Sequence, residues 1–303
     1  MQTSEQTPQV HPIQIIHAED LQDSVACFYE KYAHEPVIVK GLFTNNAFLQ
    51  GLNREKVEAL FRGQTLQAYE KTTQNLVYIP ATELFDQLRS GQVRYNVVDH
   101  PLTDSPLAAA FEVPPFLQHN WFVNSGLNSD GYEKSISCTA GGNFTPLHVD
   151  AYGMQGWMYL LYGVKHWELY APKYTPLLFD PLFKEFYHMR QDPPARFPLA
   201  PLAEKYAGTI EKGDLLFFPA AWSHQVETDE ESFGIGGSII NDYQIEQSMD
   251  CWLWERALGV ASELNLKQLL LNLPESRFSS PAGWQRTQAA LARCTAWESR
   301  ASA

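Results

Sequence analysis

Two histidines, an aspartate and a lysine stand among apolar residues in the second half of the chain. The segment FTPLHVDAYGMQGWMYLLYGVKHW, residues 144–167, holds His148, Asp150 and Lys165, and the segment DLLFFPAAWSHQV holds His224. Side chains two residues apart on a strand point to the same face, so we expect His148 and Asp150 to project together. An imidazole and a carboxylate on one face can share a cation. His224, which stands just before another strand-like run, supplies a third ligand if the two segments meet.

The identity of such a cation is left open by the three ligands alone. Two histidines and one carboxylate, with other positions on the metal free, are the ligand set of non-haem Fe(II) oxygenases. Zinc held by three protein side chains suits the same residue types. A histidine beside an apolar strand is also common as an ordinary core residue, so the prediction depends on the two segments being brought together.

Lys165 raises a separate question, because it opens a strand-like run, KHWELY, that looks buried. A buried ammonium group is costly unless it is paired with an anion. The sequence assigns it no acidic partner, so a ligand carboxylate is one candidate. The alternative is a lysine at the edge of a sheet whose end reaches water.

Composition places the chain among ordinary globular proteins. It has 303 residues, 45% of them hydrophobic and 19% charged, which suits one large domain or one domain with an appended subdomain. We expect no membrane span and no secretory signal at the N-terminus. The cysteines lack CxxC spacing and are expected to be reduced thiols of a cytoplasmic protein; they are Cys27, Cys138, Cys251 and Cys294.

The charge balance bears on the partner. With 22 basic and 35 acidic side chains, the formal net charge is −13. Lysine and arginine must neutralise phosphates when a protein binds nucleic acid, so this balance makes a nucleic-acid partner unlikely. A small molecule or a peptide is the expected substrate class.

Hydrophobic patterning changes twice along the chain. Helical spacing and one β-branched strand, PVIVKGLF, precede residue 121. Short strand-like runs between turn residues fill about 121–245, which is typical of an antiparallel sandwich or barrel. Helical periodicity then returns. We therefore expect a mainly β protein with flanking helices: N-terminal α/β elements over 1–120, a β core over 121–243 and a helical region over 244–303.

Several linked motifs resemble the Jumonji-C (JmjC) family of oxygenases in the cupin superfamily. TPLHVD resembles the family's T-x-x-H-x-D/E element, and YGVKHWELYAP resembles its G-x-K-x-W segment with a following proline. GDLLFFPAAWSH resembles G-D-x-x-x-x-P-x-x-W-x-H, and SIIND and PVIVKGLF are similar to a late and an early strand of the family. The resemblance implies a double-stranded β-helix, the jelly roll of cupins.

The resemblance also implies roles for individual residues. The metal ligands would be His148, Asp150 and His224, holding Fe(II). Lys165 would pair with the distal carboxylate of 2-oxoglutarate, with help from Thr145 and Tyr95, and Asn241 would line the same pocket. Trp157 and Trp167 are expected to serve packing, and Trp222 to form a wall beside His224.

The implied activity is a dioxygenase reaction in which 2-oxoglutarate gives succinate and CO2 while a substrate is hydroxylated. An amino-acid residue or an amino-acid-like metabolite is the expected substrate. A JmjC demethylase and a tRNA-base hydroxylase remain alternatives within the family. Outside this activity, a non-oxidative metal-binding cupin, either a zinc isomerase or a binding module, also remains.

The C-terminal helices predict a partner surface. The segment SELNLKQLLLNL is rich in leucine, with Leu266, Leu269, Leu270, Leu271 and Leu273 close together. Packing on the β core explains these leucines as well. JmjC hydroxylases often dimerise through such helices, so the resemblance implies a homodimer.

Overall fold

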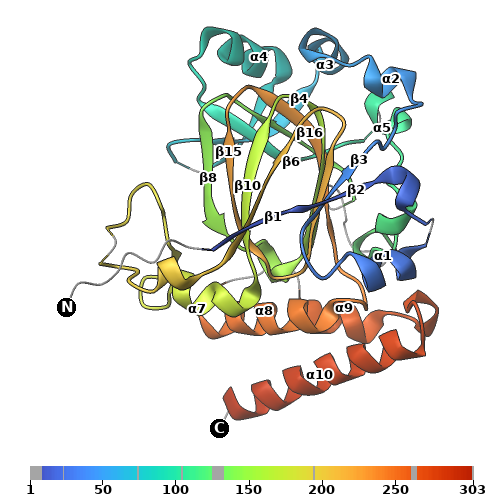
Figure 1. Ribbon diagram of the computed structural model, residues 1–303, viewed down its shortest axis with the longest axis vertical. Coiled ribbons are helices and arrows are strands. Elements are labelled where there is room, and N and C mark those ends of the chain that lie inside the picture. Colours follow the sequence, from blue (N-terminus) through green and yellow to red (C-terminus); the bar gives the residue numbers. More distant parts are fainter. Residues whose placement is uncertain are drawn as a thin grey trace.

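A computed structural model of the chain describes residues 9–22, 24–73, 75–103, 105–124, 133–193, 195–260 and 265–301. Two β-sheets face each other and form a barrel, with helices around it (Figure 1). The expected mainly β fold with flanking helices is confirmed. No helix among these described residues is long and apolar enough to cross a membrane.

The larger sheet has nine strands in the order β2-β3-β14-β9-β16-β7-β6-β4-β5. Their bounds are β2 Gln14–His17, β3 Val37–Lys40, β14 Leu215–Phe218, β9 Gln155–Tyr162, β16 Ser232–Ile239, β7 Ser135–Thr139, β6 Tyr95–Pro101, β4 Thr65–Glu70 and β5 Leu76–Pro80. Strands from the N-terminal third therefore extend the sheet on both sides of the central strands β14, β9, β16 and β7.

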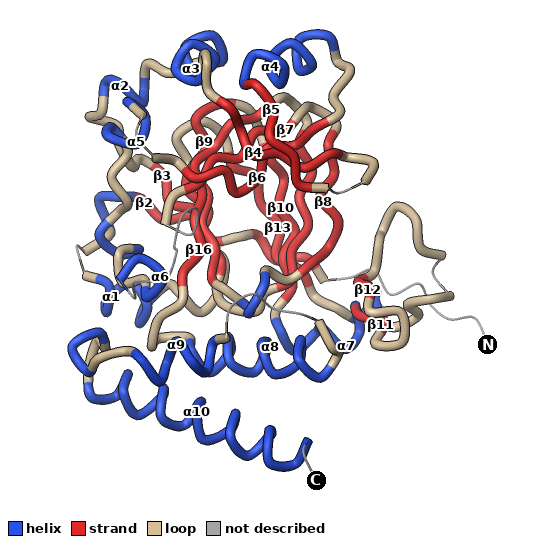
Figure 2. The backbone as a smooth tube through the Cα atoms, turned by 180° about the vertical axis from the view of Figure 1, so that it is seen from behind, coloured by secondary structure: helices blue, strands red, loops and turns tan. Residues whose placement is uncertain are grey.

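The smaller sheet has five strands in the order β1-β13-β10-β15-β8. Their bounds are β1 Val10–Pro12, β13 Lys205–Ile210, β10 Lys165–Tyr170, β15 Ser223–Thr228 and β8 Asn143–His148. Because β8 is an edge strand, the barrel has a seam beside it. A two-stranded hairpin, β11 Phe179–Asp180 and β12 Glu185–Phe186, lies at one side of the barrel (Figure 2).

Side-chain alternation divides the interior into two cores. Trp157, Tyr159 and Leu161 of β9 point outward and pack with N-terminal helices, in a core that includes Phe28 and Phe85. Leu160 and Phe218 of the larger sheet pack inside the barrel with Trp167 and Leu169 of the smaller one. The period of two along each strand thus gives the nine-stranded sheet an apolar side toward the helices and another toward the barrel interior.

Helices lie above the barrel, beside strands β2 and β3, and below the barrel (Figures 1 and 2). Their bounds are α1 Val25–Lys31, α2 Ala47–Gln50, α3 Arg54–Phe61, α4 Ala81–Ser90, α5 Pro106–Ala110, α6 Trp121–Asn124, α7 Thr175–Leu178, α8 Ile245–Ala257, α9 Leu266–Asn272 and α10 Pro281–Ala301. The C-terminal helices α8, α9 and α10 close the lower end in Figure 1. They share a core with Trp121 and Tyr152, and Cys294 of α10 is fully buried there.

Candidate metal centre

The predicted metal ligands converge at one end of the barrel. His224 of β15 lies directly opposite His148 of β8 in the antiparallel register, and their ring centroids are 4.2 Å apart. Asp150 follows two residues after His148, at the start of the 3-10 turn η3, Ala151–Gly153. Its Oδ1 lies 3.6 Å from Nε2 of His148 and 3.7 Å from Nε2 of His224. One ligand atom from each residue falls within 4.8 Å of the others, a separation that suits a shared cation.

Backbone carbonyl groups orient both imidazoles. Nδ1 of His148 donates a hydrogen bond to the carbonyl of Pro146 at 2.8 Å, and Nδ1 of His224 donates to that of Trp222 at 3.2 Å. With its hydrogen on Nδ1, each neutral ring turns the lone pair of Nε2 toward the carboxylate of Asp150. A hydrogen bond from the ring nitrogen that does not bind the metal is what holds metal-binding histidines in one tautomer.

Burial and mutual attraction shift the pKa values of the three groups. Burial lowers the pKa of His224 to about 4, so this ring is neutral at physiological pH. Burial opposes the charging of Asp150, but the two histidines lower its pKa. For His148, burial also disfavours the charged ring, yet hydrogen bonding and attraction to Asp150 raise the pKa.

Lys165 is buried inside the same barrel, with 3% of its surface exposed. Its Nζ donates to Oγ1 of Thr139 at 2.8 Å and to Oγ1 of Thr228 at 3.4 Å. Among the described residues no carboxylate forms an ion pair with this ammonium, and burial lowers its pKa to about 8. Buried charges are normally paired, so Lys165 is suited to an anionic ligand that enters the barrel.

Two threonine hydroxyl groups accept hydrogen bonds from the ammonium, and a serine hydroxyl group bonds one of them. Thr228 lies directly opposite Lys165 in the pairing of β10 with β15. Thr139 of β7 comes from the other sheet, and its hydroxyl also bonds Ser232 at 2.9 Å. None of the three was predicted from the sequence. The signal it lacked was the strand register, since only the pairing of β10 with β15 and of β7 with β16 brings them to Lys165.

Thr145 lies between the lysine and the metal ligands. It is opposite Val226 in the pairing of β8 with β15. On β15, Val226 stands between Thr228, which is opposite Lys165, and His224, which is opposite His148. Residues directly opposite on a sheet share a face, and Val226 packs in the barrel interior. Thr145 is therefore on the interior face, as its expected role requires.

Tyr95 does not point into the barrel. It packs with the outer core, the cluster outside the barrel that includes Phe28 and Trp157. Tyr95 is on the same side of β6 as Val97, which pairs with buried Cys138. Its neighbour Asn96 points the other way, and its Nδ2 donates to Oδ1 of Asn143 at 3.3 Å. Consecutive residues of a strand occupy opposite faces, so Tyr95 lies outside the barrel, and its expected role in binding 2-oxoglutarate is corrected.

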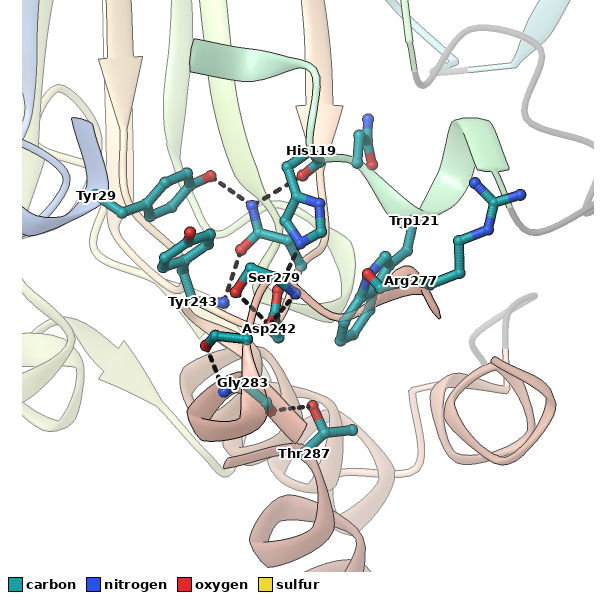
Figure 3. A network of polar contacts seen from close by, with 12 residues as sticks. Tyr29, His119, Trp121, Asp242, Tyr243, Arg277, Ser279, Gly283 and Thr287 are labelled. Atoms are coloured by element: carbon teal, nitrogen blue, oxygen red, sulfur yellow. Dashed lines mark hydrogen bonds and ion pairs between the residues drawn. The ribbon is translucent and has the colours of Figure 1, made fainter. Parts of the chain in front are cut away.

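Asn241 belongs to a network of polar contacts with Tyr29 and His119 (Figure 3). Its amide donates to the hydroxyl of Tyr29 at 2.6 Å and to the carbonyl of His119 at 3.0 Å, and its Oδ1 accepts from Gln155. Tyr29 belongs to the outer core. Asn241 is therefore a structural link between β9, β16 and α1, and its expected place in the co-substrate pocket is corrected.

The tryptophans have the packing roles expected of them. Trp157 stacks on Phe111 in the outer core, with ring centroids 5.8 Å apart. Trp167 and Trp222 belong to the barrel core, and the ring of Trp167 lies 5.6 Å from that of His224. They form an apolar wall on one side of the candidate metal centre.

Comparison with known proteins assigns the family. A family model described as a cupin-like domain matches residues 80–245. The chain belongs to the cupin-like (JmjC) family. Its match to the human JmjC domain-containing protein 8 is 28% identical over 209 residues, which is 65% of this chain and 73% of the relative. The match to the human 2-oxoglutarate and iron-dependent oxygenase JMJD4 is 24% identical over 48% of this chain and 36% of the relative.

Other relatives of this cupin-like protein carry demethylase names. The arginine-specific demethylase JMJ20 of Arabidopsis thaliana is 24% identical over 61% of this chain. That match spans 44% of the relative, and the match to lysine-specific demethylase 7B of Danio rerio spans 29% of it. The cupin-like chain thus covers less than half the length of these demethylases. At the level of the family, the comparisons support a 2-oxoglutarate-dependent oxygenase.

Proposed function

We propose that this JmjC protein is an Fe(II)- and 2-oxoglutarate-dependent hydroxylase that uses O2 and releases succinate and CO2. Its substrate is an amino-acid residue or an amino-acid-like metabolite. One observation supports the proposal most strongly: a buried ammonium, Lys165, bonded only to hydroxyl groups among the described residues, shares a barrel with a metal-ligand triad. A metal-binding cupin that uses no dicarboxylate has no need of such a group.

Each residue has a defined task in this proposal. His148, Asp150 and His224 would hold Fe(II), and three ligands leave positions for a co-substrate and O2. When bound, ferrous iron supplies the activation of O2 that oxidises both 2-oxoglutarate and the substrate. Lys165 would bind the distal carboxylate of 2-oxoglutarate, with Thr139 and Thr228 as its neighbours. The co-substrate is thereby oriented with its other end toward the triad.

The barrel interior also limits the access of water. Trp167 and Leu169 stand on β10, the strand of Lys165, and pack with Phe218 of the opposite sheet. All three side chains are at most 5% exposed. A dry, apolar wall strengthens the attraction between Lys165 and a carboxylate, because fewer water molecules compete for either charge. The same wall protects reactive species formed at the metal from side reactions.

Demethylation is the second candidate, because relatives carry that name. Hydroxylation of an N-methyl group gives a carbinolamine, whose C–N bond breaks to release formaldehyde while the proton of its hydroxyl group passes to the nitrogen. Formaldehyde release from methylated arginine or lysine peptides therefore separates this candidate from hydroxylation that leaves a stable alcohol.

Succinate formation tests the proposal. Purified protein is incubated in air with Fe(II), 2-oxoglutarate and pools of amino acids and peptides. We expect succinate release that is lost in His148→Ala and strongly reduced in Lys165→Met. A protein that holds zinc as purified and forms no succinate with any pool would favour a zinc isomerase or a binding module.

We also propose that the protein is a cytoplasmic homodimer joined through its C-terminal helices. Four of the five leucines around α9 are buried within the chain, whereas Leu271 is 57% exposed and Trp284 on α10 is 36% exposed. The four cysteines are free thiols, as expected in a reducing compartment. Light scattering at micromolar concentration should give twice the chain mass, and Leu271→Glu should reduce it to that of one chain.

A further inference from the structure

The turn that carries Asp150 is held in an unfavourable backbone conformation. Tyr152, two residues after Asp150, has φ 61°, and Gly153 has φ 55°. A positive φ is uncommon for a residue with a bulky side chain and persists only where the surroundings enforce it. The N–H of Gly153 donates to the carbonyl of Asp150 at 2.9 Å, so the strained turn and the metal ligand are directly connected.

Helix α8 holds this turn from outside the barrel. Ser248, Cys251 and Glu255 occupy one side of α8, and all three are buried. Oε1 of Glu255 accepts a hydrogen bond from the N–H of Tyr152 at 3.0 Å, and Oγ of Ser248 donates to the carbonyl of Gly153 at 3.1 Å. A Cβ at Gly153 would lie 2.6 Å from Cβ of Cys251, so the helix is pressed closely against the turn.

The same turn reaches the second ligand segment. The carbonyl of Gly153 also accepts from the N–H of Ala221 at 3.2 Å. Ala221 has φ 63° and stands three residues before His224. A single carbonyl group therefore links α8 to the backbone on both sides of the metal centre.

Glu255 is an unusual residue for this position. It is 8% exposed, and its Oε2 has no hydrogen-bond partner among the described residues. A buried carboxylate with one free oxygen costs stability. The contact it makes, to the N–H of the strained Tyr152, is the one that fixes the backbone next to Asp150.

We propose that Glu255 is a positioning residue for the metal centre, acting through Tyr152 on Asp150, and that α8 thereby sets the metal affinity. The inference rests on the proposed metal site, but it concerns binding of the metal and not the oxygenase reaction. A carboxamide at position 255 can keep the accepted hydrogen bond, whereas a methyl group cannot. This difference separates the hydrogen bond from the charge.

Metal binding without 2-oxoglutarate tests the inference. Co(II) affinity and the visible spectrum of the complex are measured for the full chain, its Glu255→Ala and Glu255→Gln variants, and Glu246→Gln as a control on the same helix, where Glu246 pairs with Arg293. We expect Glu255→Ala to weaken Co(II) binding roughly 10- to 100-fold, the usual range for outer-shell residues, and to alter the spectrum. The Co(II) affinities of Glu255→Gln and of the control should stay within about twofold of the parent's, because neither substitution removes a hydrogen bond that supports a metal ligand.

A second variant guards against a general loss of folding. Ser248→Ala removes the other hydrogen bond to the turn and should weaken Co(II) binding about 2- to 10-fold, the range of one neutral hydrogen bond. Circular dichroism identifies any variant that fails to fold. Unchanged Co(II) affinity in both folded alanine variants overturns the inference, and so does an equal loss in Glu255→Gln and Glu255→Ala. If the parent binds Co(II) through His148 and His224 but forms no succinate, the proposed function fails and this inference stands.

Discussion

Lys165 and His224 point into the same barrel from neighbouring antiparallel strands, with Lys165 opposite Thr228 and His224 four residues earlier on β15. Four strand residues correspond to about 13 Å of backbone, and the lysine side chain bridges part of that distance. A dicarboxylate that binds the ammonium at one end can therefore extend toward the metal ligands with its other end.

Replacing Lys165 with methionine should stabilise the ligand-free protein. The pKa of Lys165, lowered from 10.5 to about 8 by burial, corresponds to a cost on the order of 3 kcal/mol at neutral pH as an upper bound. Methionine removes that charge, so we expect unfolding in denaturant to require about 1–3 kcal/mol more at pH 7. Between pH 8 and 10.5 the unfolded state holds the proton and the folded state does not, so the parent gains stability and the difference shrinks.

The matched control is Lys173→Met. Lys173 is exposed, so the same substitution there should change stability by less than about 0.5 kcal/mol. Binding of 2-oxoglutarate should be lost in Lys165→Met and retained in the control. A Lys165→Met protein that is less stable than its parent at pH 7 would show that the ammonium is compensated within the protein.

Affinity for 2-oxoglutarate should fall above pH 8. Only the protonated amine of Lys165 attracts the distal carboxylate, and its pKa in the ligand-free protein is about 8. Above that value, binding must be accompanied by uptake of a proton, which lowers the association constant by up to about tenfold per pH unit. Calorimetry on protein loaded with Mn(II), in buffers of different ionisation enthalpy, measures both quantities. An affinity that stays constant from pH 7 to 9.5 contradicts the role of Lys165.

Metal affinity should fall on the acid side. A metal requires a neutral His148, whose pKa is raised above its ordinary 6.5 by Asp150 despite burial. Protons therefore compete with the metal at pH values already above 6.5. His224, with a pKa of about 4, stays neutral throughout this range. Co(II) titrations between pH 5.5 and 8 should show this loss, whereas Asp150→Asn should bind Co(II) weakly at every pH.

Gly283→Ala should detach the start of α10 from the barrel (Figure 3). A Cβ at this position would lie 1.6 Å from Oδ2 of Asp242, whose carboxylate is fixed by Ser279 and His119. We expect a loss of about 1–3 kcal/mol in the free energy of unfolding, as for other overpacked sites. Thermal unfolding measures it. Ala282→Ser, at an exposed neighbouring position, is the control and should leave the melting temperature nearly unchanged.

The sequence predicted the central strands of the barrel but missed β1, β2 and the hairpins β4–β5 and β11–β12. Runs such as DLLFFPA and FGIGGSII are short, apolar and bounded by turn residues, and they form β14 and β16. The hairpin of β4 and β5 escaped because its turn contains neither glycine nor proline. Thr73 closes this turn by donating to Glu70 and accepting from the N–H of Asn75.

The candidate site was predictable where spacing within one segment determined it. His148 and Asp150 are two residues apart, so local spacing predicted that they would lie close together, although Asp150 stands in the turn after β8 and not in the strand. Tyr95 and Asn241 could not be placed, because the face that a residue occupies changes with a shift of one position. β6 contains such an irregularity between Val97 and His100. Thr139 and Thr228 come from two different sheets, so only the three-dimensional register brings them to Lys165.

The proposed site for metal and co-substrate is tested most directly by a crystal structure of the protein grown without oxygen in the presence of Mn(II) and 2-oxoglutarate. We predict one metal ion bound by His148, Asp150 and His224, with the distal carboxylate of 2-oxoglutarate on Nζ of Lys165. A metal bound elsewhere, or a lysine still bonded only to Thr139 and Thr228 while 2-oxoglutarate occupies another site, would contradict it.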